Sequence, residues 1–430
     1  MSSLGRHLNL SAEFRLTGVI NNFRAGPTQK ISLLARVLTG GLLAAWCWAG
    51  AQETKNSVVQ SAPTPPQRPW KNGLSTNENY FPIGVWLQNP ANAARYKAAG
   101  INLYVGLWRG PTTNQLAELE KAGVSVICSQ NRAGLENKDN PIIVGWMHGD
   151  EPDNAQSRGR GQGYGPPILP EVIVQNYERM RVADPSRPIL LNLGQGVAWD
   201  NYIGRGVRRN HPEDYPEYIK GCDIASFDIY PVVHESPQIA GKLEFVARGV
   251  ERLGQWTRSE KSVWNCIECT HISNPEAKAT PAQVRAEVWM ALIHGSRGLI
   301  YFVHQFKPVA REAALLDDPE MLAAVTSINR QIHELAPVLN GPDVHDDVSI
   351  TSSTEDAPIA GMLKRRGNTT YLFTVNLRDR ATRASVTLRN AAARAEARVL
   401  GEDRKMNLRD RKFSDDFKPY EVHLYQVSGL

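Results

Sequence analysis

The sequence predicts an α/β fold, a closed (β/α)8 TIM barrel, with a small C-terminal antiparallel β-sandwich domain. From Tyr80 to Leu335, eight short apolar runs alternate with helical stretches over about 260 residues, the size and rhythm of such a barrel. No Gly-rich phosphate loop follows the first run, which disfavours the alternative of an open doubly wound sheet. Beyond Pro342 the pattern changes to short alternating strands without helical spacing.

The barrel elements are predicted in chain order from apolar runs and the residues that interrupt them. Runs of this length bounded by Gly, Pro or polar residues are typical of buried strands. Gly100 and Gly123 end the first two helices, and Pro281 begins a later one. The predicted strands are 81–86, 101–106, 124–129, 142–149, 188–193, 223–230, 262–268 and 298–303, and the helices are 91–99, 113–122, 171–183, 239–258, 281–294 and 319–335.

Two connections differ from the rest. Residues 130–140 are polar and predict only a stunted helix. Residues 156–170 are rich in Gly and Arg and long for a strand-to-helix loop, so we expect them to overhang the site. The barrel is thus assigned to residues 79–340 and the β-sandwich to 343–430, whose clearest strands are 359–363, 370–376, 384–388, 395–400 and 421–427.

The N-terminus resembles a secretory signal peptide over residues 1–51. An apolar core begins at Ile31, basic residues precede it, and it ends in Ala49-Gly50-Ala51, so cleavage is expected before Gln52. A single membrane anchor is the alternative, which the short core and its Arg36 disfavour. Residues 52–78 are polar and Pro-rich and predict a linker. The mature protein is then periplasmic or extracellular.

Composition excludes some functions. The chain has 430 residues with 42% hydrophobic content, enough for a large core. Its formal charge is +5, but residues 1–51 hold five Lys or Arg and one Glu, which leaves +1 for the mature chain and no argument for nucleic acid.

Four cysteines follow the leader, and the sequence does not say which of them would pair: Cys128, Cys222, Cys266 and Cys269. Cys266 and Cys269 have redox-motif spacing, yet on a strand their sulfurs would point to opposite faces.

The most informative stretch is Ile142–Asn154, an apolar run that ends in Gly, two acids and a proline. Pro152 cannot extend a strand, so Asp150 and Glu151 are placed at a strand's C-terminal end. That end faces the ligand in parallel α/β folds. A solvated polar turn is the other interpretation of the same residues.

A second acid, Glu268, ends the seventh predicted strand after an apolar run. Counting back by twos places Glu151 and Glu268 on the inward faces of strands four and seven, which lie opposite each other across a barrel mouth. Cleavage of a glycosidic bond needs two carboxyl groups, about 5 to 5.5 Å apart for retention and roughly 6.5 to 9.5 Å apart for inversion of configuration. The two acids suit a sugar held between them.

These motifs, G-W-M-H-G-D-E-P at strand four and W-N-C-I-E at strand seven, resemble those of the clan of retaining (β/α)8 glycoside hydrolases. The resemblance covers about residues 80–335. It implies that Glu151 is the acid/base and Glu268 the nucleophile, and a C-terminal β-sandwich accompanies several members. One residue departs from the pattern: the clan has Asn before the acid/base, and this chain has Asp150, which could alter or abolish activity.

Further substrate-binding candidates lie near other strand ends. Tyr230 could donate a hydrogen bond to the nucleophile, as in some relatives, or pack in the core. Trp86, Trp108 and Arg109 could contact a sugar, although single tryptophans are more often core residues. His304 stands where relatives often carry a Trp platform. The histidines lie in separate segments without ligand spacing, so no metal and no cofactor are assigned.

The sequence therefore predicts an exported retaining glycoside hydrolase that cleaves an equatorial, β-type bond through a covalent glycosyl-enzyme. Its expected partner is an oligosaccharide, polysaccharide or glycoside, with no nucleic acid and no stable membrane association after signal cleavage. A non-catalytic carbohydrate-binding barrel and a barrel lyase or isomerase that uses the same acids are the alternatives. The sequence does not identify the sugar, the linkage, endo or exo action, or the oligomeric state.

Overall fold

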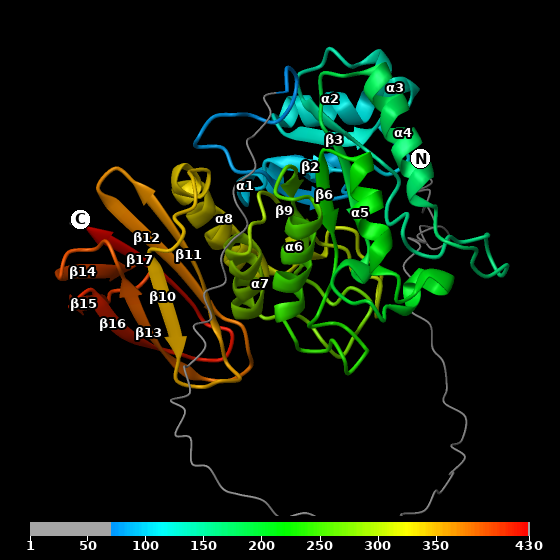
Figure 1. Ribbon diagram of the computed structural model, residues 1–430. Coiled ribbons are helices and arrows are strands. Elements are labelled where there is room, and N and C mark those ends of the chain that lie inside the picture. The colour runs from blue at the N-terminus through cyan, green and yellow to red at the C-terminus, as the bar shows by residue number, and fades with distance from the viewer. Residues whose placement is uncertain (1–69, 429–430) are drawn as a thin grey trace, which may run out of the picture. The chain divides into compact units, whose positions relative to one another are not determined.

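The computed structural model describes residues 70–428, and every structural statement below refers to this part of the chain (Figure 1). The predicted signal peptide at 1–51 and most of the predicted linker lie outside it. Residues 70–78, the end of that linker, form turns and no helix or strand.

The barrel sheet is parallel throughout and closes on itself. Each strand pairs with its neighbour in sequence except at the junction of β7 and β8, and β1 also pairs with β9, which an open doubly wound sheet does not allow. The seventh predicted strand is split at Trp264: its first half, β7, pairs with β6, and its second half, β8, pairs with β9. The strands are β1 Ile83–Trp86, β2 Leu103–Val105, β3 Ser125–Ser129, β4 Ile143–Met147, β5 Ile189–Leu193, β6 Ile224–Phe227, β7 Ser262–Val263, β8 Asn265–Glu268 and β9 Leu299–Phe302.

Helices follow most strands as predicted, but the segment before β6, predicted as a loop, contains the short helix α5, and the helix predicted at 239–258 spans Glu244–Trp256. Local chemistry fixes some ends: Thr112 and Gln115 form a capping box on α2, and Gly123 ends it at φ 63°, a left-handed conformation that Gly adopts without strain. The connection at 130–140 does contain one short helix. The α-helices of the barrel are α1 Ala93–Ala98, α2 Thr113–Ala122, α3 Arg132–Glu136, α4 Pro170–Ala183, α5 Tyr215–Tyr218, α6 Glu244–Trp256, α7 Pro281–Ile293 and α8 Pro319–Leu339.

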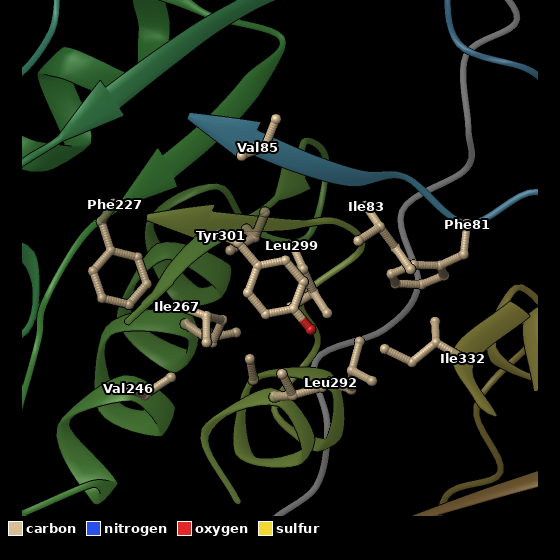
Figure 2. Packing of buried hydrophobic residues seen from close by; sticks show 14 of the residues in the cluster. Phe81, Ile83, Val85, Phe227, Val246, Ile267, Leu292, Leu299, Tyr301 and Ile332 are labelled. Carbon is tan, nitrogen blue, oxygen red and sulfur yellow. The ribbon is translucent and has the colours of Figure 1, made fainter. Parts of the chain in front are cut away.

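Two apolar clusters hold the barrel together because strand side chains alternate between its faces. The larger cluster lies between the sheet and the helices; Figure 2 shows Leu299 and Tyr301 of β9 beside Leu292, near Val246 of α6. A smaller cluster that includes Trp264 and Cys266 fills the barrel interior. The barrel is thus a packed core that presents its chemistry at the strand ends.

The C-terminal region forms one antiparallel sheet of eight strands that enclose a core of their own. Five of these strands were predicted; β10, β15 and β16 were not. The strands are β10 Val348–Ser352, β11 Ile359–Arg366, β12 Thr369–Asn376, β13 Thr382–Leu388, β14 Arg394–Val399, β15 Lys405–Arg409, β16 Lys412–Phe417 and β17 Val422–Ser428. The predicted fold class, a barrel with a C-terminal β domain, is confirmed.

The β domain packs on the barrel through α7. The ring centroids of Trp289 on α7 and Phe373 on β12 lie 5.1 Å apart, and both residues belong to the large barrel cluster. Burial of both aromatic rings stabilises this junction. Within residues 70–428 no helix has the length and apolarity that a bilayer crossing requires.

Candidate active site

The loop after β4 carries the two acids that the sequence singled out. The strand ends at Met147, before the predicted end at Gly149, although His148 still donates its backbone N–H to Leu190 O at 3.0 Å. Because the chain has left the sheet before Glu151, counting by twos does not fix the direction of its side chain. The acids do lie beyond the C-terminal end of a barrel strand, as expected.

Glu151 is half-buried and is held by its backbone in an unusual conformation. Its φ of 41° lies in the left-handed region, which a non-Gly residue occupies only with support from its surroundings. Its N–H donates to Asn192 O at 3.1 Å, and its carbonyl accepts from Asn154 N at 3.1 Å and Gln156 Nε2 at 3.2 Å. The hydrogen bond to β5 thus fixes where Glu151 leaves the strand.

The carboxyl group of Glu151 lies near that of Asp228, which directly follows β6, and Asp228 Oδ1 is a buried oxygen without a hydrogen-bond donor among the described residues. Burial raises the pKa of Glu151 well above its usual range, and the charge of Asp228 raises it further. Burial raises the pKa of Asp228 to about 8, although the hydrogen bond with Glu151 opposes that shift. Burial and the neighbouring carboxyl groups therefore favour the protonated form of both Glu151 and Asp228 near neutral pH.

Asp228 has a second hydrogen-bond partner. Tyr230 Oη donates to Asp228 Oδ2 at 3.3 Å, and Asp228 N donates to Leu193 O at 3.1 Å. The ring of Tyr230 also packs against Phe302 at 5.1 Å between centroids. Tyr230, a predicted site residue, therefore lies at the site and orients Asp228.

Asp150 lies beside the pair and is held by β5. Asn192 Nδ2 donates to Asp150 Oδ1 at 3.0 Å, and Asn192 Oδ1 accepts from Ser226 Oγ at 2.7 Å. Burial raises the pKa of Asp150 to about 6, against the effect of the Asn192 bond. Asp150 in turn raises the pKa of Glu151, as expected for like charges in one site.

Asp153 anchors the same loop from below. It is fully buried, accepts from Gly194 N at 2.9 Å and from Tyr215 Oη at 3.0 Å, and lies 4.0 Å from Arg205 Nε. Arg205 also donates to Asp214 Oδ2 at 2.7 Å. This network ties the acid-bearing loop to the segment after β5.

Glu268 lies in a fully buried position. It ends β8 but is 0% exposed, and its carboxylate accepts from Val232 N at 2.6 Å and Val233 N at 3.1 Å. Its other partner is Glu287 of α7. Among the described residues no hydrogen bond joins Glu268 to Glu151 or Asp228, and its expected place opposite Glu151 stays a prediction.

The break in strand seven explains this position. The pairing of β6 with that strand ends at Ala225 and Val263, and Trp264 N then donates to Ala225 O at 2.9 Å. β8 pairs with β9 alone among the described strands. The loop after β6 consequently covers the end of β8, where its amides bind Glu268.

The other predicted contact residues separate into two groups. Trp86 lies inside the barrel cluster, and His304 is 1% exposed with Nε2 3.2 Å from Gln88 Nε2. Packing encloses both side chains, and their contact with substrate stays a prediction. Trp108 is 38% exposed and lies with Arg109 on the loop after β2, at the same end of the barrel as the acids. The Arg109 guanidinium lies 5.7 Å from the Trp108 ring centroid.

The four cysteines are buried free thiols, so no described pair is a disulfide. Cys266 belongs to the interior cluster and Cys269 to the outer one, which agrees with opposite faces. Within residues 70–428, no group of three or more His, Cys, Asp or Glu residues has an arrangement suited to a metal ion.

Sequence reasoning missed Asp228, Asn192 and Tyr202. Tyr202 is buried, and its pKa is raised by burial and then by Glu151 and Asp228, which places it beside the pair. Asp228 follows an apolar strand just as Asp150 does, and the same criterion could have found it. Asn192 and Tyr202 give no comparable signal, because their places depend on the barrel closing and on the path of a long loop.

Comparisons with known proteins support the architecture. No protein-family model matches the chain, and no curated protein is similar to it in sequence. Among solved structures, a single-residue variant of AmyP in complex with maltotriose is similar with a TM-score of 0.50 at 9% identity, over 82% of this chain and 97% of that one. At this identity the likeness shows the fold.

Solved glycoside hydrolases are also among the structural neighbours. An α-amylase from Geobacillus thermoleovorans in complex with acarbose has a TM-score of 0.41 at 10% identity, over 84% of this chain and 99% of that one. A glycoside hydrolase family 30 subfamily 8 xylanase from Clostridium acetobutylicum has 0.42 at 8% identity, over 81% and 96%.

Proposed function

We propose that this protein is a glycoside hydrolase in which Glu151 is the general acid and Asp228 the second catalytic carboxyl group. The observation that carries the proposal is the group of neighbouring carboxyl groups, Glu151, Asp228 and Asp150, beyond the C-terminal ends of β4 and β6, with Tyr230 Oη 3.3 Å from Asp228 Oδ2. A group that protonates a leaving oxygen must hold its proton at the working pH, and the raised pKa of Glu151 meets that need. The location at the C-terminal face of a barrel supports a catalytic role.

A retaining mechanism is part of the proposal, because the acid motif after strand four resembles that of retaining hydrolases. Retention requires about 5 to 5.5 Å between the two carboxyl groups and inversion roughly 6.5 to 9.5 Å, so Glu151 and Asp228 would have to move apart to hold a glycosidic bond. Entry of a glycosidic bond between them would break the hydrogen bond and free Asp228 to attack. Tyr230, which donates to Asp228 Oδ2, would keep the other oxygen directed at the sugar.

The substrate proposed is an oligosaccharide, polysaccharide or glycoside with an equatorial bond. The acid motif after strand four, which resembles that of retaining hydrolases of such bonds, supports this choice. Asp150 could accept a hydrogen bond from a sugar hydroxyl, and the exposed Trp108 offers a ring face to sugar C–H groups.

A panel of aryl glycosides and polysaccharides tests the activity. The unmodified protein is expected to release sugar from at least one, and Glu151→Gln and Asp228→Asn should each lose at least about a hundredfold in kcat/KM, since general acid–base groups contribute that much. Glu235→Gln is the matched control, because Glu235 is exposed on the loop after β6. Full activity in either site variant would contradict the assignment.

A second candidate is a carbohydrate-binding barrel without turnover. The expected nucleophile Glu268 is 0% exposed, and Asp150 stands where the retaining clan has Asn before the acid/base. Calorimetric binding of an oligosaccharide that the protein never hydrolyses would favour this candidate.

We also propose export, on the basis of the apolar core and Ala49-Gly50-Ala51. Secreted protein from a bacterial host should begin at Gln52 on N-terminal sequencing. An intact leader on cytosolic protein would contradict export.

A further inference from the structure

A second carboxyl pair, Glu268 and Glu287, lies in the barrel wall outside the candidate site. Both residues are 0% exposed, and they come from β8 and α7. Both oxygens of Glu287 lack a conventional hydrogen-bond donor, which two ionised carboxylates could not tolerate in a buried place. One proton between the two groups resolves this problem, because a protonated carboxyl group donates to its neighbour.

The pair is connected to the candidate site by backbone. Val232 and Val233, whose amides bind Glu268, follow Asp228 by only a few residues along the same loop. Asn274 Nδ2 donates to Val233 O at 3.1 Å, and Gly241 N donates to Pro231 O at 2.9 Å. Of these anchors, only Glu268 holds two consecutive amides, and a carboxylate acceptor makes stronger hydrogen bonds than a neutral one.

We propose that Glu268 is a positioning residue: joined to Glu287 through a shared proton, it fixes the loop after β6 and thereby the place of Asp228. In this arrangement Glu268 touches no substrate. The proposal rests on the proposed function for its catalytic consequence, but the anchoring of the loop stands apart from it.

The surroundings of the pair supply no charge that replaces the proton. Glu287 is the charged group facing Glu268, and Glu268 the one facing Glu287. The Cys269 thiol faces both, and Lys278 of the next loop and Asp318 at the start of α8 lie beyond it. Burial raises the pKa of Glu268 to about 7 and that of Glu287 well above its usual range.

These shifts give the pair a defined effect on stability. A carboxyl group whose pKa is higher in the folded protein than in the unfolded chain ionises more readily when the protein unfolds. Its contribution to the free energy of unfolding is therefore complete below the pKa of the unfolded chain and is lost as pH rises through the pKa of the folded protein. For Glu268 that window runs from about 4.5 to about 7, and for Glu287 it extends higher.

Amide hydrogen exchange tests the anchoring without any substrate. In Glu268→Gln, Val232 and Val233 should exchange about tenfold faster or more, because a side-chain amide offers one acceptor oxygen where the carboxylate offered two. In Glu287→Gln they should stay protected, since the new amide can donate to Glu268, and Glu235→Gln is the exposed control. Unchanged exchange in Glu268→Gln would overturn the proposal.

Thermal unfolding provides a second readout that does not depend on the first variant folding. Between pH 5 and pH 8.5, Glu287→Gln should lose less Tm than the unmodified protein, because one buried group with a raised pKa is gone. An equal loss in both proteins would contradict the shared proton. If no glycoside is ever cleaved, the proposed function fails while both of these results remain decisive for the pair.

Activity separates positioning from covalent catalysis. With an active substrate, Glu268→Gln should lower kcat and leave external azide without effect, since no nucleophile has been removed. Rescue of Glu268→Gln by azide would identify Glu268 as the nucleophile and overturn the positioning role.

Discussion

At the scale of single residues, the path of the chain around each carboxyl group decides its chemistry. Glu151, Asp228 and Asp150 are neighbours, and burial keeps their pKa values high. Glu268 is also an acidic residue at a strand end, yet its carboxyl group is enclosed by two backbone amides and by Glu287. The sequence could place acids at strand ends, but the partner of each acid depends on loops whose course no local pattern encodes.

The coupled pair predicts an unusual pH dependence. The active form holds one proton, on Glu151, with Asp228 ionised, so activity should rise as Asp228 loses its proton. Because burial raises the pKa of Asp228 to about 8, the acidic limb of kcat/KM should lie well above the usual range of an aspartate. A pH profile checks this; a limb near pH 4 would show that Asp228 is not the ionising group.

At the scale of elements, the loop after β4 and the split strand seven shape the site. Most helices and strands of the barrel could be predicted from apolar runs, from Gly residues that end helices and from Pro residues that begin them. The bounds predicted for α2 are the observed ones. The break at Trp264 could not be predicted, since Val263–Ile267 is apolar except for Asn265 and typical of one continuous strand.

Asp153 is predicted to hold the acid-bearing loop. Asp153→Asn keeps the size of the side chain but replaces one acceptor oxygen with an NH2 group, so it cannot accept from both Gly194 N and Tyr215 Oη. The free energy of unfolding should therefore fall by about 1–3 kcal/mol. Activity should fall with it, since Glu151 lies two residues away. Denaturant unfolding gives the first quantity.

Asp200→Asn is the matched control. Asp200 Oδ1 pairs with Arg252 Nη2 at 2.7 Å in a partly exposed position, where loss of an ion pair changes stability by less than about 1 kcal/mol. Equal effects of the two substitutions would remove Asp153 from a special role.

At the scale of the whole molecule, the barrel and the β domain share a core across α7. The spacing of apolar and polar residues predicted both domains, but it did not predict the strands β10, β15 and β16. β15 and β16 carry many Lys, Arg and Asp residues because one side of each faces solvent, so their apolar content is too low to mark a strand.

Phe373→Ala tests the shared core. Loss of a buried aromatic ring beside Trp289 should lower the free energy of unfolding by roughly 3–5 kcal/mol. Val309→Ala, at a side chain that is 58% exposed, should change it by less than about 0.5 kcal/mol. Two separate unfolding transitions, with only one shifted by Phe373→Ala, would show that the barrel and the β domain fold independently.

The most direct test is to locate the covalent intermediate. A 2-deoxy-2-fluoro glycoside of the sugar that the protein hydrolyses should inactivate it, and peptide mass spectrometry should find the sugar ester on Asp228. A label on Glu268 would contradict the assignment of the Glu151–Asp228 pair as the catalytic carboxyl groups.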